Sequence, residues 1–308
     1  GSVIRTQLVT DQKLARQEEE KIRAQNDLNR LRSLVNLGNW FRAQGLYVDA
    51  LEYFTQATMY TTAMVDKQPL NVASTADKNA PLFTRTYVGM AELQRNLGVY
   101  KDCEFWLNKA RKVYQHRLDR NHVLKADALS CEGNLLMAKC SYKDARGVIN
   151  EALNIRHRAY GNSHPQIATI YAQLATLSLL EHDYLEAEHM ANQADEMRRV
   201  FYSETTGCET HPALANSMHC LALVDFHLCR YTEAVKKLKD SQELYSAVLK
   251  PDHPVVARIM VCIAEIYLLK GETPVAEKFV GEALLIQNNC LTDSQGRTHM
   301  HLGVANQL

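Results

Sequence analysis

The residues of this sequence with the clearest potential for metal chemistry are His219-Cys220 and His227, with Cys229 close by. Imidazole and thiolate groups are the usual zinc ligands, and a structural zinc site needs four of them in a tetrahedron. On a helix, neighbouring residues point about 100° apart. His219 and His227 therefore share a face that the cysteines do not join, and we predict no metal site and no cofactor.

Histidine followed by proline occurs three times, and imidazole groups can relay protons. The pairs are His164-Pro165, His211-Pro212 and His253-Pro254, and His122 holds the equivalent place upstream. Proline is well tolerated in the first turn of a helix, where its missing N–H costs nothing, and the preceding histidine can hydrogen-bond the loop. Because these histidines follow one another at steps of 42, 47 and 42 residues, we interpret them as regularly spaced helix starts.

Motifs for catalysis are otherwise missing. The sequence has no phosphate-binding loop, dinucleotide loop, nucleophile elbow or HExxH pattern, so we predict that the protein is not an enzyme. Equal numbers of basic and acidic side chains, 35 of each, argue against nucleic-acid binding. Because no apolar run is long enough to span a membrane and no secretory signal opens the chain, we expect a cytoplasmic protein. Its eight cysteines are then expected to be free thiols.

An internal repeat of paired helices organises the chain. A tight turn and an apolar pattern centred on a small residue recur six times at one spacing, in most cases with an aromatic residue after the turn, which chance does not explain. The second helices are expected around Ala50, Cys103, Ala145, Ala187, Ala234 and Ala276. The first helices carry small residues at Gly38, Ala91, Gly133, Ala175, Ala222 and Ala264. Since a hairpin of helices cannot bury its apolar face alone but a stack of hairpins can, we predict an all-α solenoid with at least roughly 70% helix and no sheet.

This pattern resembles the tetratricopeptide repeat (TPR) family. Within it, the 42-residue period and the step Asp252-His253-Pro254 are similar to the kinesin light chain and nephrocystin-like branch, over residues 145–286. The resemblance implies a right-handed superhelix of about six hairpins whose first helices line a concave, peptide-binding groove. Light-chain repeats typically carry paired asparagines at two positions of the first helix, and here only Asn36 and Gln173 keep an amide there. Peptide binding in general is therefore implied, but cargo binding of the light-chain kind is not.

The groove positions differ between the two ends of the array. Counting from the small residues gives these partner-binding candidates: Arg42, Arg85, Arg95, Asn39, Asn96, Asn134, His219, Phe226 and His227. The three arginines are predicted to converge on one concave surface, where their guanidinium groups suit carboxylates. The C-terminal part is apolar and suits an anchor side chain. We therefore predict a protein or peptide partner with an acidic segment and an apolar anchor, and a solvated wall that binds nothing is the alternative.

Three regions are expected: a charged N-terminal helix at 1–30, the repeat array at 31–287 and a tail at 288–308. The charged helix carries a heptad-like stripe of Leu14, Ile22, Leu28, Leu31 and Val35. Such a helix either caps the first repeat or ends a coiled coil. Extra residues at 61–81 and near 203–210 are interpreted as loops between helices.

Several cysteines recur in register with the repeat. Cys131, Cys220 and Cys262 share one position, and Cys140 and Cys229 share another. A cysteine that recurs in this way behaves as a small packing residue.

Two functions follow from this organisation. The first is an adaptor or scaffold that holds a partner peptide in its groove, in a cytoskeletal or transport setting. The second is a structural subunit of a larger, stable complex that uses the convex face, the loops and the N-terminal helix. One basic and one apolar end of the groove favour the first.

Overall fold

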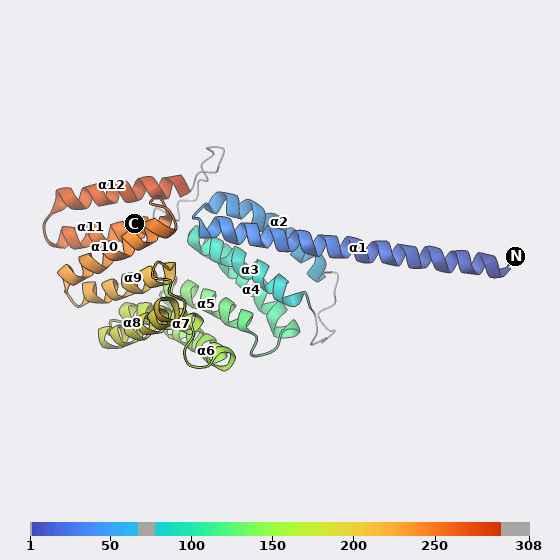
Figure 1. The fold of residues 1–308 in the computed structure, drawn as a ribbon, viewed down its shortest axis with the longest axis horizontal. Coiled ribbons are helices and arrows are strands. Elements are labelled where there is room, and N and C mark those ends of the chain that lie inside the picture. The colour runs from blue at the N-terminus through green and yellow to red at the C-terminus, as the bar shows by residue number, and fades with distance from the viewer. Residues whose placement is uncertain (1, 67–77, 291–308) are drawn as a thin grey trace.

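The computed structural model describes residues 2–66 and 78–290, and in this part of the chain it contains twelve α-helices and no strand. Helix accounts for 85% of the structure, which confirms the predicted all-α solenoid. Successive helices pair into six antiparallel hairpins (Figure 1). The hairpins are α1 (Ser2–Ala43) with α2 (Tyr47–Asp66), α3 (Ala80–Asn96) with α4 (Tyr100–Arg117), α5 (Val123–Ala138) with α6 (Tyr142–Tyr160), α7 (Pro165–Leu180) with α8 (Tyr184–Arg199), α9 (Pro212–His227) with α10 (Tyr231–Val248), and α11 (Pro254–Leu269) with α12 (Thr273–Cys290).

The four spaced histidines cap the helices that they precede. In each case the imidazole Nδ1 accepts a hydrogen bond from the backbone N–H two residues later, at 3.1–3.2 Å. The cap satisfies one of the N–H groups that every helix start leaves without an intrahelical partner. The capping residues are His122, His164, His211 and His253. The structural interpretation of the histidine steps is therefore confirmed.

Small residues bring the two helices of a hairpin close together, as the repeat pattern predicts. A Cβ atom added at Gly133 of α5 would lie 2.4 Å from Cγ1 of Ile149 on α6. Ile149 is fully buried and β-branched, so it has little freedom to move aside. Gly147, also on α6, has open space where its Cβ would be.

We expect Gly133→Ala to lower the free energy of unfolding by about 1–3 kcal/mol, because it overpacks a filled core. Gly147→Ala is the control and should raise it by about 0.5–1 kcal/mol, since alanine is the better helix former. Urea denaturation followed by circular dichroism measures both. Equal effects of the two substitutions would show that close approach at Gly133 does not matter.

The turn inside each hairpin takes one residue into the left-handed region of backbone conformation. Glycine fills this place at Gly45, Gly98 and Gly271, whereas Cys140, His182 and Cys229 hold it in the middle hairpins with φ of 59°, 63° and 59°. Cys140 and Cys229 are exposed. Their interpretation as packing residues is therefore wrong, because a turn and not the core sets that register position. Cys131 and Cys220 are buried and Cys262 is half-buried, and all eight cysteines are free thiols.

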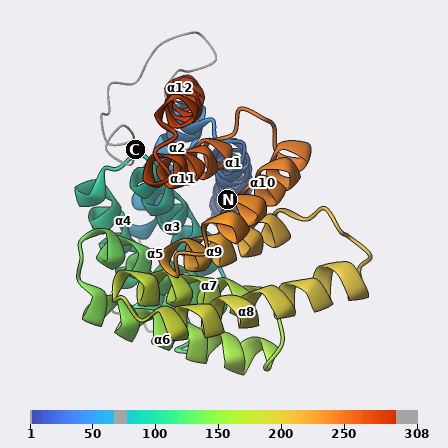
Figure 2. The same cartoon turned by 90° about the vertical axis from the view of Figure 1, so that its left-hand side faces the viewer.

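The hairpins curve around a central space. Figure 2 shows α3, α5, α7 and α9 nearer the middle of the molecule, with α4, α6 and α8 toward the outside. The last hairpin, α11–α12, comes round to lie beside the first, α1–α2 (Figures 1 and 2). Nε2 of His253 lies 3.0 Å from the carbonyl oxygen of Ala43, although 210 residues separate them. First helices from both ends of the chain therefore face one central space.

The flanks and insertions depart from the expected boundaries. The predicted N-terminal helix and the first helix of the array form one continuous helix, α1, whose N-terminal part projects beyond the hairpins (Figure 1). Ile22 is 62% exposed, and packing into the core begins around Leu28 and Leu31. Around Ile22, therefore, this helix does not cover the first repeat. The side chain of Leu14, most of the first insertion (67–77) and the tail from 291 lie outside the described residues. In the second insertion, residues 203–205 belong to a π-helix, Val200–Thr205, that extends α8, and residues 206–211 form the predicted loop.

Candidate functional site

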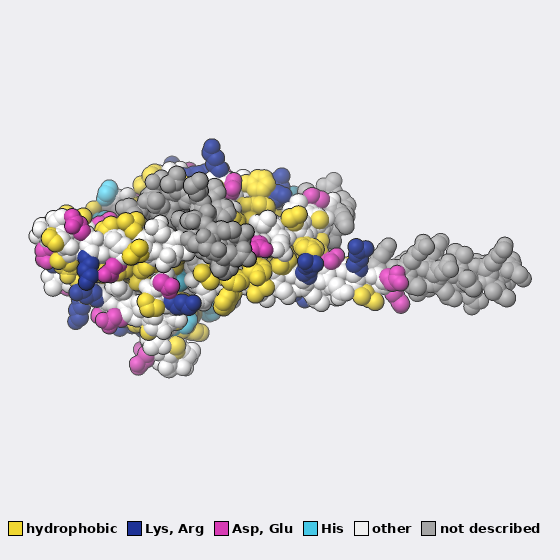
Figure 3. Space-filling model, turned by 90° about the horizontal axis from the view of Figure 1, so that it is seen from above, with side chains coloured by type: hydrophobic (Ala, Val, Ile, Leu, Met, Phe, Trp, Pro, Cys, Tyr) yellow, Lys and Arg dark blue, Asp and Glu magenta, His cyan; other side chains and the backbone are white. Residues whose placement is uncertain are grey.

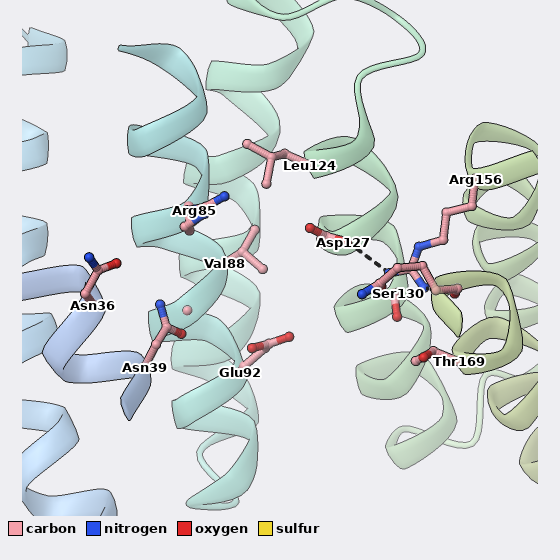
Figure 4. A pocket seen from close by; sticks show the side chains of 12 residues that line it. Asn36, Asn39, Arg85, Val88, Glu92, Leu124, Asp127, Ser130, Arg156 and Thr169 are labelled. Atoms are coloured by element: carbon pink, nitrogen blue, oxygen red, sulfur yellow. Dashed lines mark hydrogen bonds and ion pairs between the residues drawn. The ribbon is translucent and has the colours of Figure 1, made fainter. Parts of the chain in front are cut away.

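Two cavities open on the inner surface formed by the first helices. The N-terminal cavity has a volume of about 520 Å³ and lies between α1, α3, α5 and the start of α7 (Figure 4). The central cavity has a volume of about 580 Å³ and is lined from α3, α5, α7, α9 and α11. The fifth residue of α5, α7, α9 and α11 lines one or both of these cavities. These residues are Asp127, Thr169, Asn216 and Arg258. The repeat register therefore sets which side chains face the centre.

Charges in the N-terminal cavity are largely paired. Arg42 contacts Glu92 at 2.8 Å, and Arg156 contacts Asp127 at 2.9 Å (Figure 4). Burial raises the pKa of Asp127, and the adjacent Arg156 acts in the opposite direction. Arg85 projects into this cavity from α3 and has no ion-pair partner among the described residues. The expectation of three equivalent arginines is therefore corrected: Glu92 neutralises Arg42, whereas Arg85 stays available.

The central cavity joins the two ends of the array. Arg95 reaches it from α3, and Arg258 and Glu265 reach it from α11. Arg95 donates a hydrogen bond to Oδ1 of Asn96 at 2.9 Å, and Arg258 has no ion-pair partner among the described residues. Met137, Leu223 and Val261 supply apolar wall beside these charges. The predicted basic and apolar ends therefore meet in one place, because the array closes on itself.

Histidine 219 lies in the wall of the central cavity as a neutral group. It is 9% exposed, and its Nε2 lies 4.0 Å from Sγ of Cys262. Burial, aided by the positive charge of Arg258, lowers the pKa of His219 to about 3. The imidazole therefore contributes hydrogen-bonding capacity and shape to the cavity, but no charge, at neutral pH. Across the described residues, no three potential metal ligands among His, Cys, Asp and Glu come together.

This buried imidazole should make stability fall on acidification. The unfolded chain takes up a proton near pH 6.5, whereas the folded protein holds His219 neutral down to about pH 3. The unfolded state therefore binds more protons between these values, and stability rises with pH there. Going from pH 8 to pH 5 should cost about 2 kcal/mol through this group.

Urea unfolding at pH 8 and pH 5 measures this effect in the wild type and in His219→Asn. The free energy of unfolding lost between the two pH values should be about 2 kcal/mol smaller in the variant. The other histidines are common to both proteins and act as the internal control. An unchanged pH dependence in the variant would contradict the neutral, buried state.

The remaining sequence-predicted residues divide into two groups. Asn39 lines the N-terminal cavity and Asn134 the central one, whereas Asn96 lines a third, smaller cavity between the first and last hairpins. Phe226 packs with the core of the last two hairpins, and the ring of His227 stacks on Tyr184 at 5.6 Å between centroids. Neither lines the N-terminal or the central cavity, because the end of α9 meets neighbouring hairpins there. We leave Phe226 and His227 out of the candidate site.

Arg156 was not among the residues predicted from the sequence, because it lies on α6, the second helix of its hairpin, and only first helices were expected to line the groove. Its guanidinium reaches Asp127 and also the carbonyl oxygen of Gln166, at 2.9 and 2.5 Å. Arg198, one repeat later, binds the carbonyl oxygen of Ala213, the equivalent of Gln166. Both arginines stand four residues after the small residues Ala152 and Ala194, and this recurrence is the signal that could have found them.

Comparison with known proteins identifies the repeat. A tetratricopeptide repeat family model matches residues 124–199 and 213–289. A clustered mitochondria protein homolog of Culex quinquefasciatus is 31% identical over 145 residues, which is 47% of this chain and 10% of that protein. The chain therefore matches only about a tenth of the length of such relatives.

Solved structures share the fold. A Rap protein in complex with competence and sporulation factor has 11% identity over 87% of this chain and 77% of that chain, with a TM-score of 0.61. The TPR-like repeats of a Podosopora anserina protein named as a kinesin light chain have 17% identity over 70% of this chain and 98% of that chain, with a TM-score of 0.48.

The repeat model and the twelve paired helices agree with each other, and together they confirm the expected family. No helix in the described part of the chain combines the length and the apolar character that crossing a membrane requires. TPR arrays act as scaffolds for protein interactions, and their partners are proteins or peptides. The chain is a tetratricopeptide repeat protein that resembles the kinesin light chain repeats, and its architecture is that of a protein-interaction scaffold.

Proposed function

We propose that the inner surface of this array binds an acidic segment of a partner protein and that the chain acts as a non-catalytic adaptor. The observation that carries the proposal is the central cavity, where Arg95 and Arg258 stand beside Met137, Leu223 and Val261. Guanidinium groups without carboxylate partners gain by meeting them, and an apolar wall favours one buried anchor side chain. Arg85 extends the basic surface into the N-terminal cavity.

The way this groove would hold a peptide differs from that of light-chain repeats. Gln173 is one of the two amides left at the light-chain positions, and it is already engaged. Its Oε1 accepts a hydrogen bond from Ser130 at 2.8 Å, and its Nε2 donates to the carbonyl oxygen of Ser130 at 3.2 Å. We therefore assign recognition to the arginines and the apolar wall, and not to a ladder of amides on the peptide backbone.

The cellular setting of the proposal rests on resemblance. A Rap protein of the same fold was solved with competence and sporulation factor bound, which supports a ligand-holding role for such an array. The similarity of the 42-residue period and of the Asp252-His253-Pro254 step to kinesin light chain repeats suggests a cytoplasmic adaptor in a cytoskeletal or transport process.

Selection from a displayed library of random peptides tests the proposal. Wild-type protein as bait should enrich peptides that combine aspartate or glutamate with one large apolar residue. The double variant Arg85→Glu/Arg95→Glu, used in parallel, should fail to enrich them. Enrichment of basic peptides, or of the same acidic peptides by both baits, would show that these arginines do not recognise the partner.

A second candidate function is assembly into a stable complex through α1. This candidate is supported by apolar side chains exposed along α1. Ile22 is 62% exposed, Leu37 41% and Trp40 55%. In the face seen in Figure 3, hydrophobic side chains gather where α1 enters the array. Light scattering over a dilution series tests it, since an oligomer that survives dilution supports assembly and a monomer at every concentration opposes self-assembly.

A further inference from the structure

The first and last hairpins meet at a contact that we call the seam, formed by residues 43–47 and 253–258. Nδ1 of His253 accepts from the N–H of Val255, so Nε2 carries the proton and donates to the carbonyl oxygen of Ala43 at 3.0 Å. Gly45 sits against Pro254, and a Cβ at Gly45 would lie 2.3 Å from its Cδ. Gly45 also has a φ of +75°. The close approach of Pro254 requires glycine there, whereas the positive φ alone does not, since Cys140, His182 and Cys229 adopt it in other turns.

The seam borders a small, partly open cavity of about 60 Å³ with both polar and apolar walls. Arg95, from the second hairpin, and Arg258, from the last, both line it. Neither forms an ion pair among the described residues, and Nε of Arg95 is buried without a hydrogen-bond partner. Two guanidinium groups without ion-pair partners among the described residues, one from each end of the array, therefore line one small cavity.

Other groups around the cavity are also able to interact with a polar ligand. Val255, in the first turn of α11, lines it, and a helix N-terminus carries partial positive charge. Gln287 is 6% exposed and lines the same cavity, and its Oε1 has no hydrogen-bond partner in the described part of the chain. A carboxamide can turn to donate its N–H₂ group instead. Arg42, Arg95 and Arg258 all act to lower the pKa of Tyr47, against the larger effect of its burial.

The charge distribution makes a closed and empty seam unfavourable. Like charges at a partly buried site repel more strongly than in water, and the positive end of α11 adds to that repulsion. A single anionic group between the guanidiniums would turn the repulsion into two charge-assisted hydrogen-bonding contacts. This volume has room for more than one water molecule, so it admits the head of an anion.

We infer that the seam cavity binds an oxyanion, a phosphate or a carboxylate group, between Arg95 and Arg258, and that the bound group holds the two ends of the array together. The site needs residues from both ends, so it exists only in the closed form. Its existence does not depend on a partner in the groove. A carboxylate of a bound partner would fill it as well as a free anion would.

Hydrogen exchange followed by mass spectrometry on the purified chain tests this inference. Exchange of the backbone amides in 43–47 and 255–258 is compared in inorganic phosphate, in a tetra-aspartate peptide with blocked ends, and in chloride of the same ionic strength. Phosphate or the peptide should slow exchange at both segments several-fold. Slowing by phosphate alone assigns a phosphate group, and slowing by the peptide alone assigns a carboxylate.

Matched variants separate the seam from the groove. Arg258→Gln should remove the protection, and Arg258→Lys, which keeps the charge, should retain part of it. Arg85→Gln should keep full protection, because Arg85 lines the N-terminal cavity and not the seam. Circular dichroism checks that each variant is folded.

If neither anion slows exchange in the wild type, or if Arg258→Gln responds as the wild type does, the seam is not an oxyanion site. Protection at the seam together with no peptide bound in the groove would overturn the proposed function alone. Peptide binding in the groove without protection at the seam would overturn this inference alone.

Discussion

Replacing Phe54 with alanine should lower the free energy of unfolding by about 3–5 kcal/mol, the usual cost of deleting a buried phenyl ring. Phe54 is fully buried in the cluster formed with Met90, Leu93 and Leu97. Two glycines make room for its ring: a Cβ at Gly38 would lie 3.0 Å from the ring, and one at Gly89 would lie 2.6 Å from it. Because the backbone of two helices closes on the ring, the site has little capacity to collapse into the cavity left by alanine.

Phe105→Ala is the matched control. The side chain of Phe105 is 52% exposed, so its removal should cost less than about 1 kcal/mol. Urea unfolding is followed by circular dichroism, and the slope is compared as well as the midpoint, because repeat arrays can unfold in stages. Similar losses for both substitutions would contradict the packing described for the first two hairpins.

Reversing two groove charges, Arg85→Glu/Arg95→Glu, should weaken binding of a selected acidic peptide by about ten-fold or more. Exposed ion pairs contribute only about 0.2–1 kcal/mol each, but partly desolvated arginine–carboxylate pairs contribute more. Reversal also replaces attraction with repulsion at two places, and 1.4 kcal/mol already corresponds to ten-fold. Higher salt should weaken the wild-type interaction, since partly exposed charges are screened.

The control for this experiment changes net charge equally but away from the cavities. Lys112 and Arg120 are exposed and line neither cavity, so Lys112→Glu/Arg120→Glu should leave affinity within about two-fold, because screening weakens long-range effects. Isothermal titration calorimetry at two salt concentrations measures all three proteins. Equal weakening by both double variants would reduce the effect to overall charge and remove the role of the groove.

Local sequence patterns anticipated the hairpins because each pattern has a local physical cause. The histidine steps mark helix starts, since the imidazole bonds a backbone N–H two residues away. The small residues mark close helix contacts within one hairpin, as at Gly133 and Ile149. In both cases the partners lie within one repeat, so the spacing in the sequence carries the information.

Features that depend on distant partners were not predictable in this way. The contact of His253 with Ala43 arises from the summed curvature of six hairpins, and no single repeat encodes it. The ion pair of Arg42 with Glu92 joins α1 and α3. It neutralises an arginine that the repeat register had predicted to be available to a partner. Phe226 obeys the register but lies near the end of α9, where a neighbouring hairpin covers it.

Site-specific photocrosslinking tests most directly the central claim that a partner segment binds inside the array. A benzoylphenylalanine is placed at Thr176, in the wall of the central cavity, or at Leu185, which is 77% exposed on α8. A third protein carries it at Ile22 on the projecting part of α1. The account predicts that the selected acidic peptide crosslinks from position 176 and from neither of the others. Crosslinking from position 185 or 22, with none from 176, would contradict it.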